Sequence, residues 1–454
     1  VRLVRAYKPD IIIPSFLDIN GQHGHHRAIT RATIEAYDNS DNSKIYKDSQ
    51  FKPWKISQIF LPAWGGGGGA YDDEEDPPEA THFIDVGDFN NIFGGTYNQI
   101  GEWSRSYHST QNVSKLAYED KLTVPLHLLK GTHVDGDITG GVIPKNLYEL
   151  SEFSKDKSGK HLLIEAHKYS LDAIESFNKT DQLITNLCKL QKLLGDAEKS
   201  FSEEQVHRIQ LKQKQCSYAM ADCIALLPSL SFISNNHFVG GKIKANLSIH
   251  KSDKFNISNL NKKIITPFET DLSFQNEINI SSNRLNYIFE GTINQNTTYQ
   301  DLYQEWHGIA LEPSGLHAKV KFNVNDTNFS INVMPNENFT IIPNIIGSLE
   351  EKKIINIISS KNKNNETTKI PIKFLVTKFS SGSEDLVLNY PKDWICDNPI
   401  LKLDNNNNLE AVSYHTELQI KSQINEGLSK IFLTSNGTRI SEISKFGYSH
   451  TGNI

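Results

Sequence analysis

The sequence predicts an α/β domain, followed by a helical connector and two β-sandwich domains. The apolar run at residues 11–13, which a helical pattern follows from Arg27, is typical of a buried strand in a parallel sheet. Helical periodicity then fills residues 147–227, and strict alternation of apolar and polar residues begins after Pro228. The predicted parts cover residues 1–140, 141–228, 229–345 and 346–454.

The first two parts each show a clear order of elements. Residues 56–61 and 83–86 predict two more short strands, and the helix that starts at Arg27 should stop in the polar turn at residues 38–42. In the connector, leucines at helical spacing predict a helix capped by Thr180 or Asp181, and another helix should open near Ser202.

The C-terminal half alternates as antiparallel strands do. Four stretches carry the pattern, at residues 243–249, 318–324, 370–376 and 416–420. Asparagine-rich runs separate some of them and predict turns. Period-2 alternation bounded by such turns is typical of antiparallel sandwiches.

Composition excludes several classes of protein. The 454 residues are 37% hydrophobic and 22% charged, and the formal net charge of -6 argues against a nucleic-acid partner. No run of about 18 apolar residues predicts a transmembrane segment. The chain opens on Val1 and shows no targeting segment, and we expect its true N-terminus to be missing, so the sequence leaves the compartment open.

The strongest chemical signal is a histidine stretch at residues 20–28. His23, His25 and His26 fall within four positions, between the predicted strand and the predicted helix. Neutral imidazole is a common zinc ligand and the usual acid or base near neutral pH. In a loop, His23 and His26 can converge while His25 turns away. A chance cluster of exposed histidines is the alternative.

Two motifs in this order resemble the PIG-L (LmbE-like) de-N-acetylase family. The first is Lys8-Pro9-Asp10 with its apolar run, then His23-Gly24-His25-His26-Arg27-Ala28. The second runs from Tyr97 through Arg105 and His108 to Gln111, with Thr110 in place of the family's serine. The resemblance implies a Rossmann-like sheet with zinc at the carboxyl ends of its strands, here as the second half of such a domain in a large multidomain bacterial member.

The resemblance also implies roles for single residues. His26 would be a zinc ligand and His23 the catalytic histidine, while His108 and Arg105 would bind substrate. A helix-capping or structural role is the alternative for His108. His25 stands where the family commonly has an acidic residue. The family's His-Pro-Asp-Asp motif, which gives the other two ligands and the aspartate base, does not occur, so we expect this chain to bind zinc poorly and to be inactive by itself.

Two functions follow as hypotheses. The first is zinc-dependent hydrolysis of an N-acetyl group on an N-acetylglucosamine-type sugar or glycoconjugate by the full-length protein. The alternative is a non-catalytic carbohydrate-binding or scaffolding protein with a degenerate deacetylase domain. The sequence leaves open the exact substrate and the oligomeric state.

The last part has its own resemblance. The run Leu388-Asn389-Tyr390-Pro391-Lys392-Asp393-Trp394 and the strands after it are similar to immunoglobulin-like modules found beside bacterial glycosidases. Trp394 is either a carbohydrate-stacking residue or, as burial tendencies favour, part of the sandwich core.

Overall fold

The structure is a computed structural model, and it falls into two compact units. The first holds residues 1–220 and the second holds most of residues 221–454. The residues described are all except 15–17, 19–21, 46, 48–50, 64–75, 92, 108–122, 233–235, 239, 267–272, 282, 295–315, 337–339, 343–344, 350–366, 379–383, 393, 404–410, 422–430, 436–437 and 440–454.

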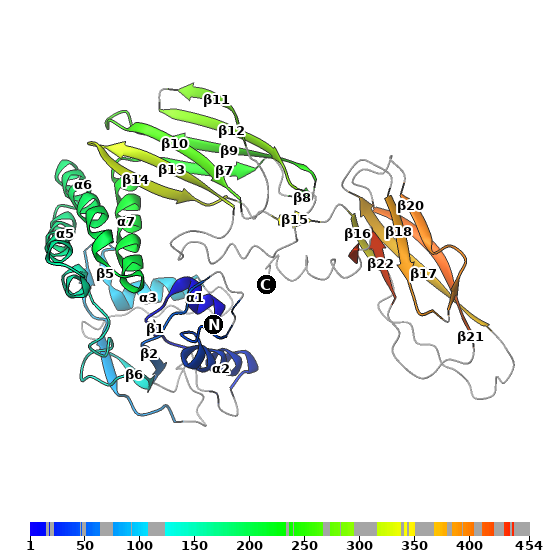
Figure 1. Cartoon of the computed structure of the whole chain (residues 1–454), viewed down its shortest axis with the longest axis horizontal. Helices are drawn as coiled ribbons and strands as arrows, with labels where there is room; N and C mark the ends of the chain where they lie inside the picture. Colours follow the sequence, from blue (N-terminus) through cyan, green and yellow to red (C-terminus); the bar gives the residue numbers. More distant parts are fainter. Residues whose placement is uncertain are drawn as a thin grey trace. The chain divides into compact units, whose positions relative to one another are not determined.

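The first unit opens with a four-stranded sheet of order β1-β2-β6-β3 (Figure 1). Its central strand β2 is buried along its whole length, whereas β1 lies at the edge with both residues half-buried. This part also contains three helices and one two-stranded hairpin. The elements are α1 Arg2–Tyr7, β1 Ile11–Ile12, α2 Gly24–Asn39, β2 Gln58–Pro62, β3 His82–Asp85, β4 Phe89–Asn90, β5 Gly95–Thr96, α3 Tyr97–Ser106 and β6 Thr123–Lys130.

The predicted Rossmann-like parallel sheet is wrong. Only β1 and β2 run parallel; β6 pairs antiparallel with both β2 and β3. Parallel neighbours need a crossover connection, and among the described elements only α2 supplies one between paired strands. The expectation of a buried first strand also fails, because an edge position leaves Ile13 49% exposed.

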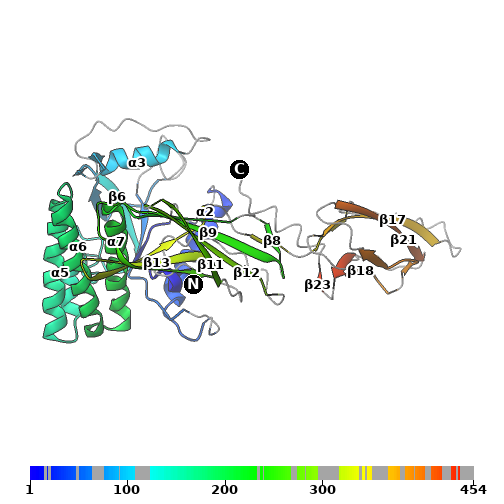
Figure 2. The ribbon, with the colours of Figure 1, turned by 90° about the horizontal axis from the view of Figure 1, so that it is seen from above.

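Three long helices follow the sheet and lie side by side (Figure 2). Asp156 caps α5 by accepting a hydrogen bond from the Gly159 amide, and Thr180 is the first residue of α6. The helical elements of this region are α4 Leu147–Leu150, η1 Ser151–Phe153, α5 Lys157–Glu175, α6 Thr180–Ala197, η2 Glu198–Ser200 and α7 Glu203–Cys223.

An ion pair ties α7 to the start of the sheet. Arg208 donates two hydrogen bonds to Asp10, at 2.5 and 2.7 Å, and both side chains are about four-fifths buried. The Trp54 ring lies under the Arg208 guanidinium at 5.9 Å, and its Nε1 donates to the Pro9 carbonyl oxygen at 2.8 Å. This contact fixes the helices on the sheet.

His207 beside this pair makes the stability of the unit depend on pH. Its ring packs edge-on against Trp54 at 4.9 Å. Burial, and then the neighbouring Arg208 and Lys8 charges, lower the pKa of His207 to about 4, while the Asp10 charge and a hydrogen bond with the Glu204 backbone oppose this.

We expect the free energy of unfolding to fall as the pH drops from about 6.5 to about 4, because the unfolded chain binds a proton there that the folded chain does not. The His207 contribution should be about 1–2 kcal/mol after allowance for solvent screening. Urea unfolding across this range, compared with His207→Gln, measures it. An identical pH dependence in both proteins would contradict the prediction.

The second unit begins with two antiparallel sheets. Strand β9 of the first sheet and strands β13 and β14 of the second bury alternate residues, which gives these strands one buried face. One sheet has the order β11-β12-β9-β7 and the other β10-β13-β14. The strands are β7 Leu227–Phe232, β8 Asn236–Phe238, β9 Lys242–His250, β10 Ser258–Ile265, β11 Ser273–Ser281, β12 Arg284–Thr292, β13 His317–Val324, β14 Thr327–Val333 and β15 Thr340–Ile342, which pairs with β8.

The last part is a sandwich of two four-stranded sheets, with orders β16-β17-β21-β19 and β20-β18-β22-β23. Both sheets contribute to one core, for example Phe374 from the first and Leu386 from the second, and Trp394 packs partly buried against it. The β-rich C-terminal region is therefore confirmed. The strands are β16 Ile345–Leu349, β17 Thr367–Lys378, β18 Glu384–Asn389, β19 Ile395–Cys396, β20 Ile400–Leu403, β21 Ala411–Lys421, β22 Phe432–Ser435 and β23 Thr438–Arg439.

Within the described residues, no helix has both the length and the apolar character needed to cross a membrane.

Candidate functional site

The three histidines lie in the first turn of α2. His23 is the residue before the helix, and its carbonyl oxygen accepts hydrogen bonds from the amides of His26 and Arg27, at 3.0 and 3.2 Å. The helix therefore starts at Gly24, three residues earlier than the sequence predicts. His23 and His26 have the three-residue spacing that places side chains on one side of a helical turn, and His25 directly precedes His26.

The rings form one cluster that includes His25, which would turn away in the loop arrangement that the sequence also allows. The His25 and His26 ring centroids are 4.2 Å apart, and those of His23 and His26 are 5.6 Å apart. One ring nitrogen from each histidine can be chosen so that all three lie within 4.8 Å of one another. Among the described residues this is the one group of three or more side chains that could hold a metal ion.

The surroundings of His26 favour its neutral form. Burial, followed by the neighbouring His25 and His23 rings, lowers the pKa of His26. The helix N-terminus acts in the same direction, because its partial positive charge opposes protonation of imidazole. A neutral imidazole has the lone pair that a metal ion needs.

The carboxylate closest in sequence before the cluster is engaged elsewhere. Asp18 accepts a hydrogen bond from Arg27 Nε at 2.7 Å and another from Arg31 Nε. The bond from Arg31 has the larger effect, and together the two bonds hold the pKa of Asp18 below its usual range. An anion paired with two guanidinium groups is a poor general base, and the metal-ligand group itself contains no carboxylate.

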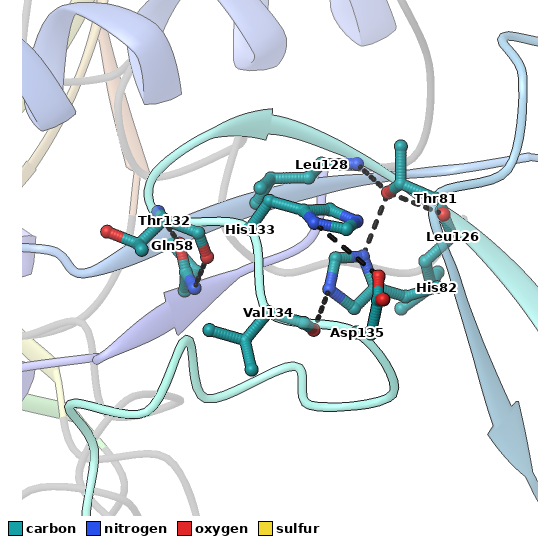
Figure 3. Close-up of polar contacts among 9 residues, drawn as sticks. All are labelled: Gln58, Thr81, His82, Leu126, Leu128, Thr132, His133, Val134 and Asp135. Carbon is teal, nitrogen blue, oxygen red and sulfur yellow. Dashed lines mark hydrogen bonds and ion pairs between the residues drawn. The ribbon is translucent and has the colours of Figure 1, made fainter.

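A second polar cluster lies between β2, β3 and the loop after β6 (Figure 3). His82 is 1% exposed, with Nε2 3.1 Å from the Val134 carbonyl oxygen and Nδ1 2.8 Å from Thr81 Oγ1. Because a carbonyl only accepts, Nε2 carries a hydrogen. Nε2 therefore holds the loop to the sheet, and Nδ1 is used in the contact with the neighbouring Thr81.

Gln58 fixes the same loop from the other side. Its amide donates to the Thr132 carbonyl oxygen at 2.8 Å and accepts from the Thr132 amide at 2.9 Å (Figure 3). His133 Nδ1 lies 3.8 Å from the fully exposed Asp135 carboxylate. The sequence analysis singled out neither Gln58 nor His82, and no local motif marks either residue. The cluster is a structural clamp.

The predicted substrate-binding residues are only partly placed. Arg105 lies exposed in the last turn of α3, with Nη1 3.8 Å from the Glu102 carboxylate. His108, Thr110 and Gln111 lie outside the described residues. The structure thus brings together His23, His25 and His26, while Arg105 stands on a separate helix.

No family model and no curated protein matches this chain. Among solved structures it is similar to two adhesins and a third protein. The InvE adhesin of Yersinia pseudotuberculosis shows 9% identity and a TM-score of 0.17 over 46% of this chain and 59% of that one. The FdeC adhesin of Escherichia coli shows 10% identity and a TM-score of 0.16 over 48% and 62%.

The third is a DUF4785 family protein of Legionella pneumophila, with 14% identity and a TM-score of 0.16 over 46% of this chain and 47% of that one. The chain thus spans between 47% and 62% of the length of these structures. TM-scores of 0.16–0.17 are too low to carry a fold or a function to this chain.

The predicted membership of the PIG-L family is wrong. No family model matches the chain, and the mixed sheet is not the Rossmann-like sheet that the resemblance implies. The predicted N-deacetylase activity, which rested on this membership, is also wrong. The catalytic role of His23 was proposed only for the deacetylase reaction, so it has no remaining support. A metal-ligand role for His26 stays a prediction.

Proposed function

We propose that this chain is a non-catalytic binding protein and that its histidine cluster binds a divalent transition-metal ion such as zinc. The observation that supports the proposal is the convergence of His23, His25 and His26, each of which offers a ring nitrogen within 4.8 Å of the other two. The resemblance gave this chain one ligand and an expectation of poor binding, whereas the cluster offers three candidate ligands.

The cluster needs only small movements to fit a metal ion. Tetrahedral zinc with nitrogen ligands at about 2.0–2.1 Å requires nitrogens about 3.4 Å apart. His23 and His25 are exposed, so their side chains can rotate by this amount without disturbing the core. Water would fill the fourth position.

Zinc titration tests this site. Isothermal titration calorimetry of the chelator-treated chain should show one equivalent of bound zinc, and His26→Ala should weaken the affinity about tenfold or more. His161→Ala, an exposed histidine of α5, is the matched control and should bind as the wild type does. Zinc affinity equal in the His26 and His161 variants would overturn the proposal.

A carbohydrate is the second ligand that we propose for this binding function. Its support is the exposed surface of residues 82–107, whose large hydrophobic side chains are all aromatic among the described residues. Aromatic rings with polar neighbours suit the mixed surface of a sugar. Chitohexaose is a β-1,4-linked hexamer of N-acetylglucosamine. It should bind to the protein, and mass spectrometry of the recovered sugar should show that all its acetyl groups are intact. Release of acetate would contradict a non-catalytic function.

A further inference from the structure

Six of the nine large exposed aromatic side chains described in the first unit gather in one short segment. They are Phe83, Phe89, Phe93, Tyr97, Trp103 and Tyr107, between 49% and 86% exposed. Elsewhere in the described residues the large exposed hydrophobic side chains are mainly aliphatic. A concentration of this kind marks an interaction site more often than scattered single residues do.

The β4–β5 hairpin and α3 hold some of these rings in place. The Trp103 ring covers Gly95 so closely that a Cβ atom there would lie 2.9 Å from Trp103 Cη2. Asn90 Nδ2 donates to the Tyr97 hydroxyl at 3.2 Å. Trp103 nevertheless stays 49% exposed and Tyr97 51% exposed. Both rings are therefore supported from beneath and open on the other side.

The helix that presents the rings is itself well defined. Thr96 and Gln99 form a reciprocal capping box, in which each side chain bonds the backbone of the other residue. None of the residues of α3 is buried, and Figure 2 shows the helix clear of the other described helices. The rings thus stand on a fixed scaffold with an open face.

The charge of the segment indicates an uncharged ligand. Residues 82–107 contain three acidic side chains (Asp85, Asp88 and Glu102) and one basic side chain, Arg105. Stacking sites for single-stranded nucleic acid combine aromatic rings with a strongly basic groove, which this composition excludes.

A sugar ring fits the remaining chemistry. One face of a pyranose presents C–H groups that pack on an aromatic ring, and its hydroxyl groups seek charged and amide partners. Glu102 and Arg105 lie 3.8 Å from each other on α3, so the helix that carries Trp103 also carries a hydrogen-bond acceptor and donors.

We propose that the β4–β5 hairpin and α3 form a platform on which an uncharged oligosaccharide stacks against Tyr97, Trp103 and Tyr107. This inference rests on the proposed carbohydrate-binding function. It specifies where on the chain the sugar binds and which side chains it contacts. It is independent of the histidine cluster and of any bound metal.

Oligosaccharide titration of single variants tests the platform. Calorimetry with chitohexaose, cellohexaose and maltohexaose should find at least one sugar bound by the wild type. Tyr107→Ala removes a ring that is 86% exposed, so it should leave the fold intact and weaken binding about fivefold to tenfold. Trp103→Ala should weaken binding more. Tyr148→Ala, an exposed aromatic side chain of α4, is the matched control and should bind as the wild type does.

The outcomes separate this inference from the function on which it rests. A sugar bound equally by the wild type and by the Tyr107 and Trp103 variants overturns the platform but leaves carbohydrate binding in place. If the wild type binds none of the three sugars, both fail. Self-association of the wild type that Tyr107→Ala abolishes, seen by light scattering, would instead make a second copy of the chain the occupant and overturn the inference.

Discussion

Replacing Gly131 by alanine should lower the free energy of unfolding of the first unit by about 3 kcal/mol. Gly131 has a φ of +124°, which L side chains rarely adopt, and a Cβ atom there would lie 1.6 Å from Gln58 Oε1. The same methyl group would lie 2.7 Å from the Ser57 carbonyl oxygen, which is backbone and cannot rotate away. Gln58 would have to leave Thr132, and the fully buried amide would lose both of its hydrogen bonds.

Urea unfolding followed by circular dichroism measures this loss. Gly101→Ala is the matched control, because Gly101 lies inside α3 with nothing within 4 Å of an added Cβ atom. That change should stabilise α3 by about 0.5–1 kcal/mol. If both variants unfold as the wild type does, the clamp on the loop after β6 contributes nothing to stability.

Replacing Arg208 by leucine should cost about 2–4 kcal/mol, close to the loss expected when one partner of a buried ion pair is removed. Asp10 would keep its charge while its side chain is only 18% exposed and its two hydrogen bonds are lost. Trp54 would also lose the guanidinium that lies over its ring. The substitution should therefore weaken the attachment of α7 to the sheet.

Two further variants separate charge from geometry at this pair. Arg208→Lys keeps the charge but not the planar guanidinium group. Its free energy of unfolding should therefore lie between that of Arg208→Leu and that of the wild type. Lys160→Ala breaks the exposed pair with Glu152 and should cost about 0–1 kcal/mol. An equal loss on removal of Arg208 and of Lys160 in chemical denaturation would refute a special role for the Asp10 pair.

Local patterns predicted the regular elements well where one face of the element is buried. Helix α6 forms where the leucine spacing predicts it, although Lys179 takes the cap position in place of Thr180 or Asp181, and β9 shows the buried alternation that its sequence predicts. In such elements the period of the apolar residues decides the structure. The same reasoning misjudged β1, because an apolar run is equally compatible with an edge strand, and only the pairing partners decide its burial.

The candidate sites divide in a similar way. Adjacency in the sequence was enough to single out His23, His25 and His26, whereas the contact between the His25 and His26 rings became visible only in the structure. His82 and Gln58 went unnoticed because their partners lie 52 and 74 residues further along the chain. The aromatic segment was visible in the sequence, yet whether its rings are exposed depends on what packs against them.

The sequence by itself therefore determined the helical connector, the β-rich C-terminal half and the position of the histidine cluster, since each depends on neighbours within a few residues. Tertiary structure decided the strand directions of the first sheet, the clamp at Gln58 and His82, and the open face of α3. Strand direction follows from the connections and pairings of the whole sheet, and exposure follows from contacts across the fold. Neither is encoded in a short run of residues.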